Sequence, residues 1–144
     1  MRKIMFLILA IGTLIIVTSC SDKNELEGTK PPIPVINLDS VDIPVVRGTY
    51  CWYECAEYPS IPEIVEKIEP TVVPATSKFT ISFLYTPRPS NISIARMKQG
   101  EEKLYNQSLV TPSEQGVYYY EIDARWNYDD LVADSYYAFV IEVK

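Results

Sequence analysis

The chain has 144 residues, contains no histidine, and carries 13 basic against 19 acidic side chains, for a net charge of −6. This length predicts one folded domain. The acidic balance argues against nucleic-acid binding, which needs a basic surface to displace counterions from phosphates. The lack of histidine excludes Ser-His-Asp and Cys-His catalysis, and it also excludes metal sites with histidine ligands.

The first 19 residues are predicted to be a signal peptide. A basic start, Met1-Arg2-Lys3, precedes an almost unbroken apolar run over residues 4–17. A helix of that length spans roughly 21 Å, short of the roughly 30 Å hydrocarbon core of a bilayer. A cleaved export signal is therefore favoured over the alternative, a permanent transmembrane anchor.

The residues that end this run resemble the bacterial lipobox, because Val17-Thr18-Ser19-Cys20 is an aliphatic residue and two small residues before a cysteine. The resemblance implies that the Cys20 thiol receives a diacylglyceryl group and that cleavage falls between Ser19 and Cys20. Two acyl chains anchor a protein stably, whereas one binds only marginally. The expected partner is then the cell membrane, through an N-terminal lipid on its extracytoplasmic face. The alternative is cleavage without lipidation.

The next segment is predicted to be a tether. Residues 21–30 contain one apolar residue and no aromatic one, and prolines at 31, 32 and 34 make the following stretch extended and stiff. We therefore expect a lipidated Cys20 with a flexible, proline-containing tether over residues 20–40, followed by a β-sandwich domain over residues 41–144.

The first expected strand covers residues 43–52, with Pro44 near its start suggesting an edge position. Cys51 and Cys55 follow four residues apart. In a straight strand this spacing is about 13 Å, and a disulfide needs Cα atoms within about 7 Å, so a bridge requires the chain to turn between them. Two neighbouring thiols outside the cytoplasm favour a structural disulfide. The alternative is a redox or copper(I) site, for which the chain lacks a partner histidine.

One helix is expected after this loop. Ser60-Ile61-Pro62-Glu63 fits a capping box with proline in the first turn. Apolar residues then recur with helical spacing up to Ile68, and Pro70 ends the pattern. We expect a short helix that covers an open end of the sheets.

The rest of the chain alternates with period two, which is typical of half-buried strands. Val117–Trp126 and Tyr136–Val143 are expected to form a terminal hairpin connected by residues 127–134. The other expected strands are residues 79–85, residues 92–95 and a short piece at residues 107–110.

The expected fold is mainly β: an immunoglobulin-like antiparallel β-sandwich with one short helix. The string Glu114-x-Gly116-x-Tyr118 resembles the tyrosine corner of such domains, in which the tyrosine hydroxyl bonds upstream backbone. Tyr120 stands where immunoglobulin domains have a cysteine, so the usual inter-sheet disulfide is absent.

No cofactor or metal site is expected. The acidic clusters near residues 54–57, 63–69, 101–102 and 129–134 lack the spacing of a calcium loop and are predicted to be solvated charge. Five tyrosines are expected to be exposed: Tyr53, Tyr58, Tyr105, Tyr119 and Tyr128. All of them but Tyr105 are expected to form a binding patch for a protein or a cell-wall ligand.

Two blocks together resemble a group of small lipoproteins and secreted proteins from spore-forming Gram-positive bacteria. The first is Gly48-Thr49-Tyr50-Cys51-Trp52, and the second is the pair of segments over residues 116–126 and 135–143. The resemblance covers residues 43–144. It implies an exported domain of unassigned function and supplies no catalytic residue.

The sequence thus predicts a membrane-anchored extracytoplasmic lipoprotein that acts by binding and is not an enzyme. One alternative is a small wall-active enzyme that uses carboxylates. Another is a thiol redox or copper-handling protein.

Overall fold

The computed structural model of the chain describes residues 26–144. The predicted signal peptide, the cleavage site at Ser19 and Cys20, and the lipidation at Cys20 lie outside the described residues. Within residues 26–144 the chain is mainly β, as predicted, with antiparallel sheets and one short helix. The elements are β1 Val35–Leu38, β2 Val41–Ile43, β3 Val46–Cys51, β4 Cys55–Ala56, α2 Ile61–Ile64, β5 Thr71–Val73, β6 Phe79–Ser82, β7 Asn91–Lys98, β8 Lys103–Leu104, β9 Gly116–Tyr128 and β10 Leu131–Val143.

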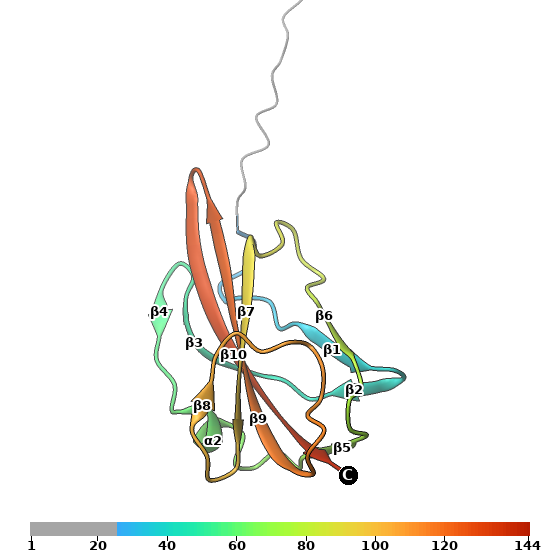
Figure 1. Cartoon of the computed structure of the whole chain (residues 1–144). Helices are drawn as coiled ribbons and strands as arrows, with labels where there is room; N and C mark the ends of the chain where they lie inside the picture. The colour runs from blue at the N-terminus through green and yellow to red at the C-terminus, as the bar shows by residue number, and fades with distance from the viewer. Residues whose placement is uncertain (1–25) are drawn as a thin grey trace, which may run out of the picture.

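The strands form two sheets (Figure 1). The small sheet has the order β2-β1-β6, and the large sheet has the order β4-β3-β10-β9-β7-β8. Strand β5 also joins the large sheet, where it pairs in parallel with the last residues of β10. This arrangement is compatible with an immunoglobulin-like sandwich.

The hairpin of β9 and β10 forms the centre of the large sheet. The two strands pair over 13 consecutive positions, from Tyr128 opposite Leu131 to Gly116 opposite Val143. The terminal hairpin is therefore confirmed, but its expected connection over residues 127–134 is wrong. The strands continue through most of that segment, and only Asp129 and Asp130 form the turn. Two-residue turns suit the right-handed twist of paired strands.

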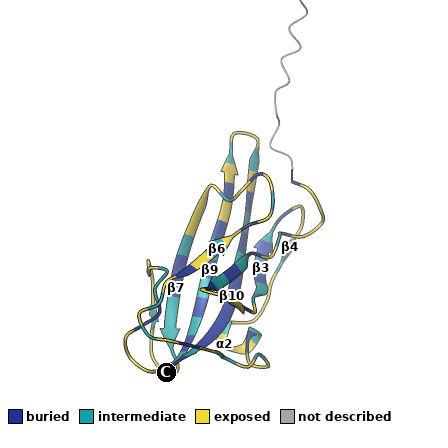
Figure 2. Ribbon diagram, turned by 90° about the vertical axis from the view of Figure 1, so that its right-hand side faces the viewer, coloured by how far each residue is buried: buried dark blue, intermediate teal, exposed yellow. Residues whose placement is uncertain are grey.

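The main core lies between the two sheets and follows the period-two pattern of the sequence. Tyr120 and Phe139, from β9 and β10, stack with ring centroids 4.7 Å apart, and Phe79 of β6 meets both rings edge-on. All three rings are fully buried. Figure 2 shows the buried positions running along the hairpin strands. Alternate residues of the hairpin therefore hold the small sheet against the large one.

The other end of the core is built around Trp126. Its ring meets Trp52 edge-on at 5.0 Å and Phe83 edge-on at 5.6 Å. Its Nε1 donates a 2.8 Å hydrogen bond to the carbonyl oxygen of Pro87. A buried indole needs such a partner, so the bond fixes the 86–90 loop over this end of the core.

The tyrosine corner is present. The Tyr118 hydroxyl donates a 2.9 Å hydrogen bond to the backbone oxygen of Glu114, four residues upstream. This bond holds the turn at residues 114–118, where the chain enters β9.

The predicted tether is wrong for its described residues, because residues 26–40 belong to the fold. Leu26 is buried in the main core, and β1 pairs with β6 at the centre of the small sheet. Side-chain hydroxyl and indole groups also donate hydrogen bonds to the backbone of residues 26–32. Trp52 Nε1 donates to Gly28 at 3.2 Å, and the hydroxyls of Tyr53, Tyr85 and Tyr137 bond Leu26, Glu27 and Pro32 respectively. Low local hydrophobicity suggested a tether, but these long-range contacts order the segment.

The single strand expected over residues 43–52 is two strands. The break falls at Pro44 and Val45, where the chain leaves β2 in the small sheet and enters β3 in the large one. Proline lacks the backbone donor that a continuous ladder requires. Two further expectations are corrected: β6 ends at Ser82, and residues 107–110 contribute only an isolated bridge between Val110 and Lys78.

The helix is shorter than predicted. It covers Ile61–Ile64, and Ser60 occupies the N-cap position without the side-chain bond of a capping box. The apolar stripe is nevertheless used, because Val65 is buried against Ala138 and Val140 of β10. The segment therefore covers part of the outer face of the large sheet, and not an open end of the sheets as expected.

Candidate functional site

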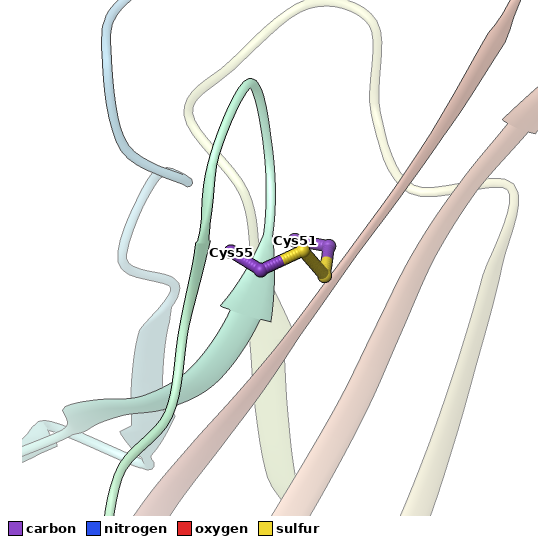
Figure 3. The surroundings of a disulfide bond; sticks show 2 residues. All are labelled: Cys51 and Cys55. Carbon is purple, nitrogen blue, oxygen red and sulfur yellow. A yellow bond between two sulfur atoms is a disulfide. The ribbon is translucent and has the colours of Figure 1, made fainter.

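Cys51 and Cys55 form a disulfide at the end of β3 (Figure 3). The turn that the sequence required is the hairpin between β3 and β4, which places the two cysteines opposite one another with Cα atoms 4.1 Å apart. The bond closes the loop that carries Trp52 and Tyr53, two of the residues that bind the backbone of residues 26–28. Its position thus points to a structural role.

The four tyrosines expected to form a binding patch do not lie together. Tyr53 bonds the backbone of Leu26, and Tyr128 bonds the backbone of Arg88 at 2.6 Å near the hairpin turn. Tyr119 packs against the α2 segment on the outer sheet face, and Tyr58 follows β4. Only Tyr58 lines the hollow described next.

The strand register places small residues side by side on the outer face of the large sheet. Ala95 of β7 and Ala138 of β10 flank Glu121 of β9. In the next row, Ser93 and Tyr136 flank Asp123. Because alanine and serine fill little space, these two rows form a low floor from which the longer side chains rise.

Two segments stand at the sides of this floor. One is residues 58–61, whose Tyr58 is fixed by a 3.0 Å hydrogen bond from its backbone nitrogen to Thr49 Oγ1. The other is the chain at and after β8. The Gln107 backbone nitrogen holds it in place by donating a 2.9 Å hydrogen bond to the backbone oxygen of Ile94. Figure 1 shows α2 and β8 near the end of the domain opposite the start of the described chain.

The floor and walls enclose three adjoining hollows that all share Glu121. They measure about 320 Å³, 430 Å³ and 340 Å³. We call them together the outer groove. It is defined by Tyr58, Ser60, Ile61, Ser93, Ala95, Lys103, Tyr105, Glu121, Asp123, Arg125, Tyr136 and Ala138.

The charges of the outer groove are paired. Lys103 Nζ lies 2.6 Å from Glu121 Oε1, and Arg125 Nη2 lies 2.8 Å from Asp123 Oδ2. Arg125 also donates through Nε to both oxygens of Asp123, at 3.2 and 3.1 Å. These hydrogen bonds, and then the negative charge of Asp123, raise the pKa of Arg125 above its usual value. The groove therefore presents fixed donors and acceptors with no net charge from these four side chains.

Tyrosine rings border the same charges. Tyr136 lies in the floor and Tyr58 in one wall, while Tyr105 lies in the other wall with Lys103 Nζ 5.5 Å from its ring centre. Tyr105 is 67% exposed, so its ring is open to solvent. Aromatic faces beside fixed polar groups are typical of small-ligand sites.

The sequence analysis did not single out the groove residues Glu121, Asp123 and Arg125. They alternate with apolar residues of β9, and this alternation was the only sequence signal of their position. The acidic clusters that the sequence analysis did consider do not converge on a metal site, since within residues 26–144 no group of three or more possible ligands is placed to hold an ion.

Comparison of the chain with protein-family models, with curated proteins and with solved structures found no match. Among the helices of residues 26–144, none has the length and apolar character needed to cross a membrane.

Proposed function

We propose that the protein is a lipid-anchored extracytoplasmic lipoprotein that acts as a binding module, with the outer groove as its binding surface. The observation that carries the proposal is the groove itself, where aromatic rings and paired charges line a hollow in a sheet face that α2 covers only in part. The N-terminal sequence supplies the anchor through its apolar run and the lipobox-like Val17-Thr18-Ser19-Cys20. The similarity to small exported lipoproteins of spore-forming Gram-positive bacteria is part of the same proposal.

The position of the groove suits such an anchor. Six residue-to-residue steps lead from Cys20 to Leu26, and at a maximum of about 3.6 Å each they reach roughly 22 Å. The end of the domain that carries Leu26 is then held near the bilayer. In Figure 1, α2 and β8 lie towards the opposite end of the domain, so the parts of the groove walls that they supply are held away from this end.

The anchor is tested by metabolic labelling with palmitate. We expect the wild-type chain to incorporate the label and to fractionate with membranes, and Cys20→Ala to do neither. Ser19→Ala is the matched control, because it keeps a small residue before the cysteine and should retain the label. An unlabelled wild-type chain, or a labelled Cys20→Ala chain, would refute the anchor.

The binding role is tested with isolated cell envelopes. The full-length protein in detergent should bind them in a saturable manner, and Tyr105→Ala should weaken the binding. Tyr53→Ala is the control, because Tyr53 is also 67% exposed but lies outside the groove. Equal binding by wild type and Tyr105→Ala would contradict a role for the groove.

One observation favours a second candidate, a wall-active enzyme using carboxylates: Glu121 and Asp123 line the same hollow. Glycoside hydrolysis uses two such groups on either side of the reacting bond. Each carboxylate here already holds a cation, which suits binding better than proton transfer. Release of reducing ends from purified wall glycan, abolished by both Glu121→Gln and Asp123→Asn, would establish the enzyme.

A further inference from the structure

We propose that the ligand of the outer groove is an uncharged glycan chain, an inference that rests on the proposed binding function and names its ligand class. The groove combines two features that hydroxyl-rich rings use together. These are open aromatic faces, and pairs of fixed acceptors and donors that lie next to each other.

The charges favour a neutral ligand that is rich in hydroxyl groups. Glu121 and Asp123 supply acceptor oxygens, and Lys103 and Arg125 supply donors within 3 Å of them. A sugar hydroxyl both donates and accepts, so it can bond each member of a pair without separating the charges. Hydrogen bonds to ionised groups are stronger than those between neutral ones, so such contacts contribute well even in a partly open groove.

The same pairing disfavours charged ligands. A polyanion would need cations that are free to meet it, and in this groove Lys103 and Arg125 each already face a carboxylate. A cationic ligand would need free carboxylates, and Glu121 and Asp123 are already paired with Lys103 and Arg125. Either ligand would have to break an existing pair in order to bind.

The tyrosines supply the second feature. The faces of pyranose rings carry C–H groups, and aromatic rings offer them a flat apolar surface. Tyr105 and Tyr58 are both exposed, and they stand in opposite walls with Tyr136 in the floor between them. The adjoining hollows favour a chain of several sugar units over a single compact molecule.

The test uses the full-length protein purified in a detergent without a sugar headgroup, since glycoside detergents would compete. Three uncharged hexasaccharides serve as probes: maltohexaose, cellohexaose and the hexamer of N-acetylglucosamine. Affinity is measured by titration calorimetry for wild type, Tyr105→Ala, Asp123→Asn and the control Tyr53→Ala. Urea denaturation of each variant shows that it is folded.

We expect saturable binding of at least one hexasaccharide. Tyr105→Ala and Asp123→Asn should each weaken it at least tenfold, whereas Tyr53→Ala should stay within twofold of wild type. The inference is overturned if no probe binds, or if binding is insensitive to both groove variants. A groove that instead binds polyglutamate in a Tyr105-dependent manner also overturns it. If binding to cell envelopes depends on Tyr105 but no hexasaccharide binds, the glycan inference fails and the binding function stands. If the envelopes also bind regardless of Tyr105, the binding function assigned to the groove fails as well.

Discussion

Removing the Cys51–Cys55 disulfide should cost a small and calculable part of the stability. The bond closes a loop of five residues, counted from Cys51 to Cys55. The chain-entropy relation gives about 7 cal/mol/K for a loop of that size, or about 2 kcal/mol at 25 °C. With about 120 ordered residues, the unfolding entropy is near 250 cal/mol/K, so Tm should fall by roughly 8 °C.

The assay is urea unfolding of Cys51→Ser/Cys55→Ser, followed by tryptophan fluorescence. Both tryptophans report on the core, because Trp52 and Trp126 are buried and in contact. The matched control is a thiol reductant, which should destabilise the wild type by the same amount and leave the double variant unchanged. A loss below about 0.5 kcal/mol would refute the entropic argument. A loss above about 4 kcal/mol would also refute it, because the loop would then be holding far more of the fold than its own five residues.

Three further results are expected from the described contacts. Tyr118→Phe removes the hydroxyl that bonds Glu114 and should cost about 1 kcal/mol in denaturant titrations; no loss would mean that the corner is unimportant. Gly116→Ala should also destabilise by about 1 kcal/mol, because φ is +147°, a backbone conformation that alanine rarely adopts, so an unchanged Tm would contradict this strain. Burial raises the pKa of Tyr137 from 10.0 to about 12. The unfolded chain then loses this proton first, so stability that is complete below pH 10 should fall by up to about 3 kcal/mol between pH 10 and 12, and a stability that stays flat over this range would contradict the shift.

Local alternation was enough to predict the strands that carry the core. Tyr120 and Ile122 on one face of β9, with Glu121 and Asp123 on the other, already distinguish inside from outside, and the structure keeps that division. The tyrosine corner was also predictable, since its bond joins residues only four apart. These features depend on neighbours in the sequence.

The features that were predicted wrongly depend on distant residues. Residues 26–34 have the composition of a tether, yet Tyr53, Tyr85 and Tyr137 bind their backbone from 27 to 105 positions further along the chain. Pro44 suggests an edge position, and β2 before it is an edge strand of the small sheet, but the sequence does not reveal that the chain changes sheets at this proline. In each case the local sequence is compatible with two structures, and a long-range contact selects between them.

The outer groove could not be predicted for the same reason, although each of its residues was visible. A polar strand face most often means contact with solvent, and nothing near Glu121 in the sequence distinguishes it from such a face. What makes it the floor of a hollow is the register, which sets Ala95 on one side of it and Ala138 on the other. Those two alanines lie 43 residues apart, counted from their numbers in the sequence. A shift of either strand by one residue would turn Glu121 or its neighbours to the opposite face and remove the hollow. The buried tyrosine and phenylalanine rings of the hairpin prevent such a shift, so the same aromatic core that stabilises the sandwich also fixes the geometry of the groove.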